Sequence, residues 1–175
     1  MTPRFDRQSD ASAAVPSAPP RLGASQDDAG GDEDFSELQR VRAPEPRLAG
    51  VHVLVVEDEP DAREIVGALL ESRGAKVVLT ASAAEAYSSL DHELPDIILS
   101  DIGMPDEDGY QFARRVRTFS PERGGKTPIV ALTAYASPQD RRRTREAGYS
   151  YHLVKPVDAE QLVNVLEMLS KARLS

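Results

Sequence analysis

The stretch Val51-His52-Val53-Leu54-Val55-Val56-Glu57-Asp58 decides the fold, because a run of mostly apolar residues ends there in two carboxylates. An apolar run of this kind is typical of a strand that is buried on both faces of a parallel sheet. The pattern recurs further along the chain, and each run ends in a reactive or charged side chain. These runs are Ile97–Ser100 before Asp101, Ile129–Leu132 before Thr133, and His152–Val154 before Lys155.

Helical patterns separate these runs, so strand and helix alternate from residue 51 onward. The predicted strands are residues 51–56, 76–79, 96–100, 128–132 and 151–154. The predicted helices are residues 61–73, 82–90, 110–119, 138–147 and 158–169. Right-handed connections between successive βα units predict an α/β fold with a doubly wound, five-stranded parallel sheet. In the order 2-1-3-4-5 the switch point lies between the first and third strands, where carboxylates end both runs.

Residues 1–49 differ from the rest of the chain in composition. They are rich in Pro, Ala and Ser, contain the acidic run 32–34, and have few long hydrophobic residues. Such a segment buries too little apolar surface to offset its loss of chain entropy on ordering. We therefore predict a disordered low-complexity tail over residues 1–49 and a folded domain over residues 50–172. Within the tail, a solvated linker is favoured over a docking motif at residues 35–41.

The bulk composition excludes several classes of protein. The chain is 40% apolar and 29% charged, which suits a globular protein. It has no cysteine, which excludes disulfides, thiolate metal sites and cysteine nucleophiles. A net charge of −8 disfavours general affinity for nucleic acids or anionic membranes. No apolar stretch approaches the roughly 18 residues of a membrane span, and the N-terminus lacks the apolar core of a secretory signal. We therefore expect a cytoplasmic location.

The strand-end residues suit the chemistry of a divalent cation and a phosphoryl group. Ligands bind beyond the carboxyl ends of the strands in open parallel sheets, so these side chains are expected to meet. Asp58 and Asp101 are the best ligands for Mg²⁺, and Glu57 can reach the ion directly or through water. Asp101 can also act as a nucleophile, with Lys155 and Thr133 neutralising the phosphoryl group. An acidic first helical turn would explain residues 57–59 alone but would leave Asp101 unexplained. A cis bond at Lys155-Pro156 would aim the lysine over the site.

Taken together, these segments resemble the receiver domain of two-component response regulators, over about 120 residues from Gly50 to Leu169. The resemblance rests on four motifs that occur in the order and at the spacing of the family. They are residues 53–60 (VLVVEDEP), 97–109 (IILSDIGMPDEDG), 129–134 (IVALTA) and Lys155-Pro156. The resemblance implies a flavodoxin-like fold.

The resemblance also implies a role for each motif. Asp101 would be the phosphoacceptor of a phosphorelay, and Glu57 with Asp58 would bind Mg²⁺. The backbone carbonyl of Gly103 would be a further Mg²⁺ ligand, and Thr133 and Lys155 would contact the phosphoryl group. The donor would be a histidine kinase or a histidine phosphotransfer protein, and the output would pass to an unknown downstream protein. Self-catalysed phosphoryl transfer and autodephosphorylation would be the only activities, with no dedicated enzyme function.

The sequence departs from the family pattern at two places. The acidic pair is Glu-Asp where the family usually has Asp-Asp, which should preserve metal binding. The switch position, three residues before Lys155, is usually aromatic but is His152 here. A switch role and an ordinary edge-of-sheet histidine both stay open for this residue.

Rival functions are weaker. A pseudo-receiver that binds partners without phosphorylation is the main alternative, although the acceptor, lysine and threonine are intact. Toprim-type enzymes need a second aspartate at Gly103, and haloacid-dehalogenase-like phosphatases need Asp-x-Asp where this chain has residues 57–59. For the basic residues 141–145, a solvated helix surface is favoured over contact with an acidic partner. No helix-turn-helix follows the domain, so direct DNA binding is not expected.

Overall fold

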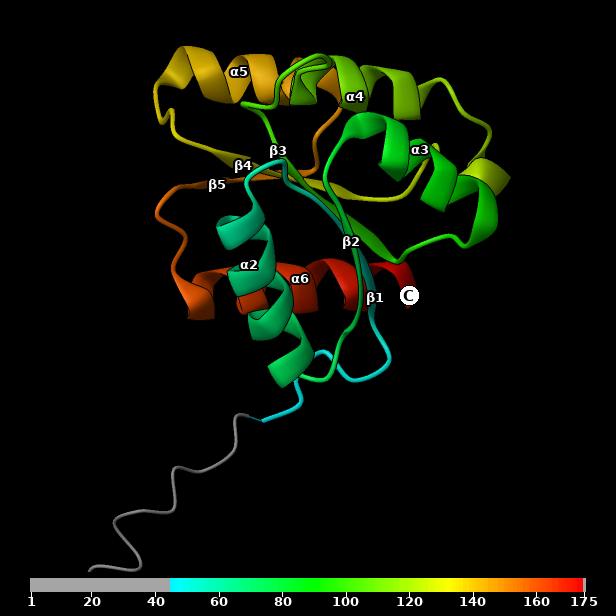
Figure 1. Ribbon diagram of the computed structural model, residues 1–175, viewed down its shortest axis with the longest axis vertical. Helices are drawn as coiled ribbons and strands as arrows, with labels where there is room; N and C mark the ends of the chain where they lie inside the picture. Colours follow the sequence, from blue (N-terminus) through cyan, green and yellow to red (C-terminus); the bar gives the residue numbers. More distant parts are fainter. Residues whose placement is uncertain (1–44, 175) are drawn as a thin grey trace, which may run out of the picture. The chain divides into compact units, whose positions relative to one another are not determined.

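The computed structural model describes residues 45–174 and shows the predicted alternation of strands and helices (Figure 1). The strands are β1 (His52–Val56), β2 (Lys76–Thr80), β3 (Ile97–Asp101), β4 (Ile129–Thr133) and β5 (Tyr151–Val154). The helices are α2 (Pro60–Ser72), α3 (Ala83–His92), α4 (Gly109–Arg117), α5 (Pro138–Ala147) and α6 (Ala159–Leu174), with a short 3-10 helix at Pro121–Arg123. The remainder of the predicted tail, residues 1–44, lies outside the described residues.

The five strands form one parallel sheet in the order β2-β1-β3-β4-β5, which confirms the predicted topology. The three central strands β1, β3 and β4 are buried along their whole length, as their continuous apolar runs predicted. Val56 pairs with Ser100, and Asp101 pairs with Leu132. Because of this register, the neighbouring strands end at the same level. The candidate residues lie at or just after these carboxyl ends.

Two layers of helices cover the two faces of the sheet (Figure 1). Helices α3, α4 and α5 pack over one face around the fully buried Phe112. Helices α2 and α6 pack over the other face, where Leu70 and Leu162 are fully buried. Burial of a leucine side chain of this kind stabilises the fold by about 1.5–3 kcal/mol. Among the described helices, none combines the length and apolarity needed to cross a bilayer.

The helix starts follow local sequence signals. Pro60 occupies the first turn of α2, where a missing N–H costs nothing. Ser137 forms a capping box with Asp140 at the start of α5, because each side chain accepts a hydrogen bond from the other residue's backbone N–H. Gly109 begins α4 where a Cβ atom would lie only 2.5 Å from the carbonyl oxygen of Asp101. The absence of a side chain at Gly109 therefore lets α4 start directly against the end of β3.

Residues 45–49, which we assigned to the tail, pack against the folded domain. Leu48 is fully buried in the core beneath α2 and α6, and its N–H donates to the carbonyl oxygen of Arg73 at 2.9 Å. The Nε of Arg47 donates to Glu167 Oε2 on α6 at 2.9 Å. The packed region thus begins before the predicted boundary, because one leucine in a proline-rich segment has no periodic pattern to reveal it.

Candidate functional site

Three carboxylates meet at the carboxyl ends of β1 and β3. Glu57 and Asp58 directly follow β1, and Asp101 is the last residue of β3. One oxygen from each of these three residues lies within 4.8 Å of the other two. Glu57 is 1% exposed and Asp101 is 7% exposed, so water screens their charges poorly. Glu57, Asp58 and Asp101 form what we call the acidic cluster.

Lys155, which follows the edge strand β5, contacts two members of the acidic cluster. Its Nζ lies 2.9 Å from Glu57 Oε2 and 2.9 Å from Asp101 Oδ1. The residue follows β5, and its backbone N–H donates to the carbonyl oxygen of Thr133 at 2.8 Å. The Lys155-Pro156 peptide bond is cis, as predicted. The lysine that the sequence placed near the site is therefore in direct contact with it.

The charges in the cluster shift the pKa values of the buried groups. Burial raises the pKa of Glu57, the Asp101 charge also raises it, and the hydrogen bond from Lys155 opposes both. Burial lowers the pKa of Lys155, but its hydrogen bonds with Glu57 and Asp101 outweigh this and raise it. The lysine therefore stays charged, and one ammonium faces three carboxylates. A cation would balance the remaining negative charge.

The donor set of the acidic cluster fits Mg²⁺. Mg²⁺ prefers oxygen ligands and keeps several waters, so two or three carboxylates that converge from one side are sufficient. Among residues 45–174, the cluster is the one group of three acidic or histidine side chains close enough to share an ion. A Cβ atom on Gly103 would lie 3.4 Å from Asp101 Oδ2, so the backbone of Gly103 runs beside the cluster. The role of its carbonyl oxygen as a further ligand stays a prediction.

Thr133 ends β4 one position after the residue that pairs with Asp101. Its side chain is 1% exposed, and its Oγ1 accepts a hydrogen bond from the backbone N–H of Tyr135 at 3.0 Å. Among residues 45–174 the Thr133 hydroxyl has no hydrogen-bond acceptor, so its proton is free to donate. The structure therefore brings together the predicted side chains at one edge of the sheet. They are Glu57, Asp58, Asp101, Thr133 and Lys155.

Two residues that the sequence analysis did not identify support the site. The Nη1 of Arg63 donates to the carbonyl oxygens of Glu57 at 2.7 Å and Asp58 at 3.2 Å. The hydroxyl of Tyr149 donates to the carbonyl oxygen of Gly109 at 2.7 Å, next to the end of β3. Contacts from side chain to backbone leave no motif in a single sequence. The only available signal was the place of Arg63 in the first turns of α2.

His152 lies on β5, and neither of its ring nitrogens bonds to the acidic cluster. Both of its ring nitrogens are buried, and neither has a hydrogen-bond partner in the part of the chain that the structure describes. Burial, followed by the positive charge of Arg141, lowers the pKa of His152, while Asp140 opposes the shift. The two roles considered for His152 both remain predictions.

Comparisons with known proteins point to one family. The family model for the response regulator receiver domain matches residues 53–167. An uncharacterized 14.6 kDa protein of Leptolyngbya boryana is 40% identical over 120 residues, which cover 69% of this chain and 90% of that protein. The response regulator Rre1 of Synechocystis sp. is 41% identical over 120 residues, which cover 68% of this chain. The chain spans only 51% of Rre1 and 18% of a gliding motility regulatory protein of Myxococcus xanthus.

Solved structures show the same architecture. One is the receiver domain of the sensor histidine kinase PA1611 from Pseudomonas aeruginosa, with a magnesium ion coordinated in its active-site cleft. It is 36% identical, covers 70% of this chain and 99% of that one, and gives a TM-score of 0.64. Another is the Saccharomyces cerevisiae complex of the phosphotransfer protein Ypd1 with the receiver domain of Ssk1. It is 27% identical, covers 70% of this chain and 90% of that one, and gives a TM-score of 0.65.

Proposed function

The chain belongs to the receiver-domain family of two-component response regulators, and from this premise we propose that Asp101 accepts a phosphoryl group in a Mg²⁺-dependent reaction. The phosphorylated domain then signals through a partner protein. The observation that best supports this proposal is the shared contact of Lys155 with Glu57 and Asp101, at 2.9 Å each, beside Asp58. A nucleophile, a fixed ammonium and a set of metal ligands thus occur in one place.

The proposed reaction is an exchange of bonds at phosphorus. A carboxylate oxygen of Asp101 forms a bond to the phosphorus of the donor, while the bond from phosphorus to the leaving atom breaks. The leaving group departs with the electron pair, and the product is an aspartyl phosphate on Asp101. Lys155 balances charge on the phosphoryl oxygens, and the Thr133 hydroxyl donates a hydrogen bond to one of them.

The ion would be held by Glu57, Asp58, Asp101 and the carbonyl oxygen of Gly103. Bound Mg²⁺ supplies charge neutralisation for the phosphoryl oxygens. Arg63 fixes the two carbonyls that precede α2, which keeps the carboxylates of the loop facing Asp101. Gly103 places no side chain over Asp101, so water can reach the acyl phosphate and hydrolyse it slowly. Self-catalysed gain and loss of phosphate are the proposed activities.

A histidine kinase or a histidine phosphotransfer protein is the proposed phosphodonor. The Ypd1 complex in the comparisons joins a phosphotransfer protein to a receiver domain. Here Ile65 on α2 is 70% exposed, on the helix that directly follows the acidic loop. We propose that this helix contributes to the surface that the phosphodonor contacts.

The test is intact mass spectrometry of the full chain after incubation with Mg²⁺ and acetyl phosphate. We expect a gain of one phosphate in the parent that is lost with EDTA and lost in Asp101→Asn. Asp106→Asn is the matched control, because Asp106 is an exposed acid of the following loop with a positive φ that asparagine tolerates. The control should gain phosphate like the parent. If the parent gains none while a known receiver does, the pseudo-receiver function is favoured.

A further inference from the structure

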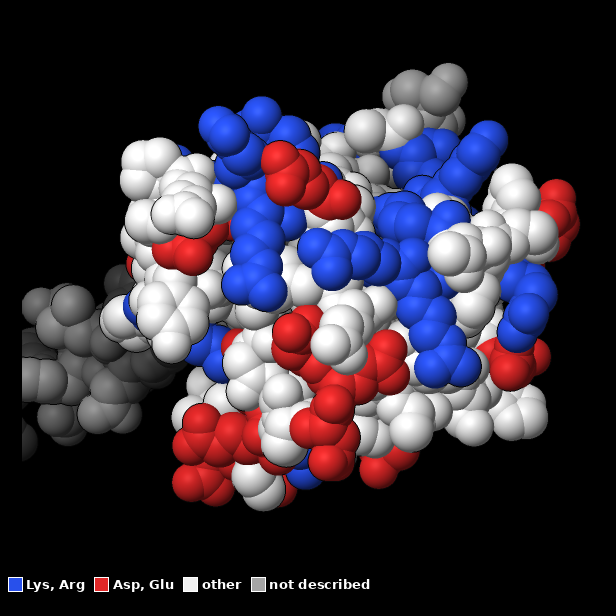
Figure 2. Space-filling view, turned by 90° about the horizontal axis from the view of Figure 1, so that it is seen from above, with Lys and Arg blue, Asp and Glu red and all other residues white. Residues whose placement is uncertain are grey.

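A buried tyrosine hydroxyl lies at the start of α4, next to the end of β3. Tyr149 is 6% exposed, and its hydroxyl donates to the carbonyl oxygen of Gly109 at 2.7 Å. Lys and Arg side chains gather over the outer surface of α4 and α5 (Figure 2), whereas Tyr149 belongs to the apolar core that these helices cover. Burial raises the pKa of Tyr149, so the hydroxyl keeps the proton that it donates.

The bond from Tyr149 fixes the base of the loop 102–108, which connects β3 to α4. The N–H of Gly109 donates to the carbonyl oxygen of Ile102 at 3.0 Å, so the two ends of the loop meet. The N–H of Ile102 in turn donates to the carbonyl oxygen of Leu132 on β4 at 3.0 Å. Tyr149 holds the carbonyl of Gly109, and Ile102 holds its N–H. The backbone at the end of the loop is therefore bonded on both sides.

The same region leaves little room for the backbone to shift. A Cβ atom on Gly109 would lie 2.5 Å from the carbonyl oxygen of Asp101 and 2.7 Å from the hydroxyl oxygen of Tyr149. The Tyr149 hydroxyl also lies 3.4 Å from Ser100 Oγ, and the Ser100 hydroxyl donates to the carbonyl oxygen of Asp101 at 2.9 Å. Tyr149 thus lies against both the end of β3 and the start of α4.

The loop 102–108 carries Gly103, whose carbonyl oxygen is the backbone ligand proposed for Mg²⁺. A Cβ atom on Gly103 would lie 3.4 Å from Asp101 Oδ2, so this backbone runs beside the acidic cluster. A backbone carbonyl cannot turn by a change of rotamer, and its direction depends on the conformation of the loop. Groups that orient a metal ligand without touching the metal change metal affinity by about 10–100-fold when they are removed.

We propose that Tyr149 is a positioning residue for the Mg²⁺ site. Its hydroxyl fixes the base of the loop 102–108 and thereby keeps the carbonyl oxygen of Gly103 where it can bind the ion. Tyr149 acts through the backbone and touches neither the ion nor the phosphoryl group. The inference rests on the proposed function, because it requires that the acidic cluster binds Mg²⁺.

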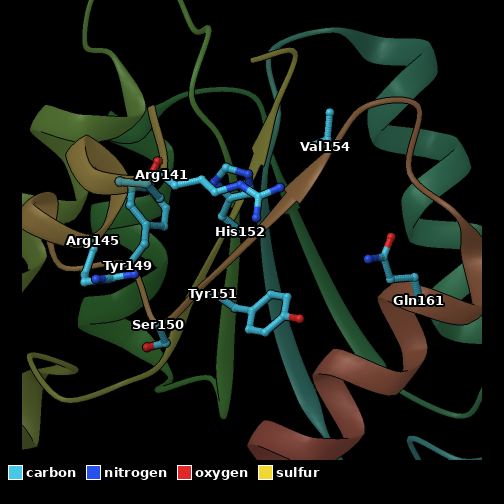
Figure 3. Close-up of a pocket in the computed structure, with 9 residues that line it drawn as sticks. Arg141, Arg145, Tyr149, Ser150, Tyr151, His152, Val154 and Gln161 are labelled. Carbon is cyan, nitrogen blue, oxygen red and sulfur yellow. The ribbon is translucent and has the colours of Figure 1, made fainter. Parts of the chain in front are cut away.

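The test is a Mg²⁺ titration of the full chain, followed by its amide NMR signals. Tyr149→Phe keeps the ring and removes only the hydroxyl, and we expect its dissociation constant for Mg²⁺ to rise by about tenfold. Tyr151→Phe is the matched control. Tyr151 is 40% exposed, and its ring points to a different side of the chain from that of Tyr149 (Figure 3). This control should change the dissociation constant by less than about twofold.

A further variant separates positioning from a general loss of stability. Leu90→Ala removes a buried side chain of α3 near Gly124, which precedes β4 and so lies toward the amino ends of the strands. It should destabilise the fold but change the dissociation constant for Mg²⁺ by less than about twofold. In Tyr149→Phe without Mg²⁺, the N–H of Gly109 should also exchange with deuterium faster than in the parent.

The outcomes separate this inference from the proposed function. Equal dissociation constants for the parent and Tyr149→Phe would overturn the inference but leave the proposed function in place, because the parent binds the ion. Equal weakening in Tyr149→Phe and Leu90→Ala would overturn it as well, because lost stability would then explain the effect. If the parent binds no Mg²⁺, the proposed Mg²⁺-dependent reaction and the inference are both wrong.

Discussion

Lys155 is the residue whose removal should reveal the charge balance of the acidic cluster. In Lys155→Met the three carboxylates face one another without the ammonium, and Glu57 is almost fully buried. We expect the free energy of unfolding to fall by about 1–3 kcal/mol in EDTA, less than for a fully buried pair because the lysine is partly exposed. Mg²⁺ should narrow the gap to the parent, because the ion replaces the lost charge.

Urea unfolding with EDTA and with Mg²⁺ measures both values. Lys126→Met, an exposed lysine after the 3-10 helix, is the control and should change stability by less than about 0.5 kcal/mol. If the fall in the free energy of unfolding of Lys155→Met is the same with and without Mg²⁺, the charge argument is contradicted.

His152 should add a pH dependence to stability. Burial and the Arg141 charge lower its pKa, so the folded protein binds a proton at this residue less readily than the unfolded chain does. The resulting stability is present above the unfolded pKa of about 6.5 and is lost as the pH falls below it. In His152→Gln the fall in unfolding free energy between about pH 7.5 and pH 5.5 should therefore be smaller than in the parent. Equal pH profiles from urea titrations would refute this.

The convergence of the candidate side chains was predictable from the sequence, but the contacts that support them were not. Each of the predicted side chains ends an apolar run, and parallel strands bring such ends to one edge. The contacts of Arg63 with two carbonyls and of Tyr149 with a third depend on the folded path of loops. A single sequence contains the side chains for these contacts but not the positions of the carbonyls.

At the scale of elements, Arg117 at the end of α4 joins two loops, one before β4 and one before β5. Its Nε donates to the carbonyl oxygen of Gly148 at 2.9 Å, and its Nη1 donates to those of Gly125 at 3.0 Å and Thr127 at 2.8 Å. Arg117→Met keeps the apolar stem and removes all donors. We expect a loss of about 2–4 kcal/mol in the free energy of unfolding, since charged hydrogen bonds are lost and partly buried carbonyls remain.

The comparison variant is Arg114→Met on the same helix. Arg114 is exposed, and its guanidinium has no ion pair or hydrogen bond within residues 45–174. The free energy of unfolding of Arg114→Met should therefore fall by less than about 0.5 kcal/mol. Urea midpoints that are equal for the two variants would show that the three contacts of Arg117 do not stabilise the fold.

The starts of helices were easier to predict than their ends. Pro60 and Ser137 mark their helices in the sequence, and the structure begins α2 and α5 where these residues indicate. Helix α4 ends at Arg117, before the predicted end at residue 119, and α6 continues to Leu174, beyond residue 169. Helix ends depend on tertiary contacts such as those of Arg117, so local sequence determines them less well.

At the scale of the whole molecule, the packed region begins before residue 50. Leu48 is fully buried, so Leu48→Ala should lower the free energy of unfolding by about 2–4 kcal/mol through lost burial and a residual cavity. The exposed Glu45 provides the control, and Glu45→Ala should change it by less than about 0.5 kcal/mol. Thermal or urea unfolding measures both. A domain that begins at residue 50, as the sequence predicted, would tolerate both substitutions equally.

The segment before β1 has a practical consequence for anyone who shortens this protein. A version that starts at Val51 would keep every motif of the family yet lose Leu48 from the core and Arg47 from its contact with Glu167. It would expose the apolar surface that Leu48 covers next to α2 and α6, and exposed apolar surfaces promote aggregation at high protein concentration. A trimmed gene should therefore begin no later than the codon for Glu45.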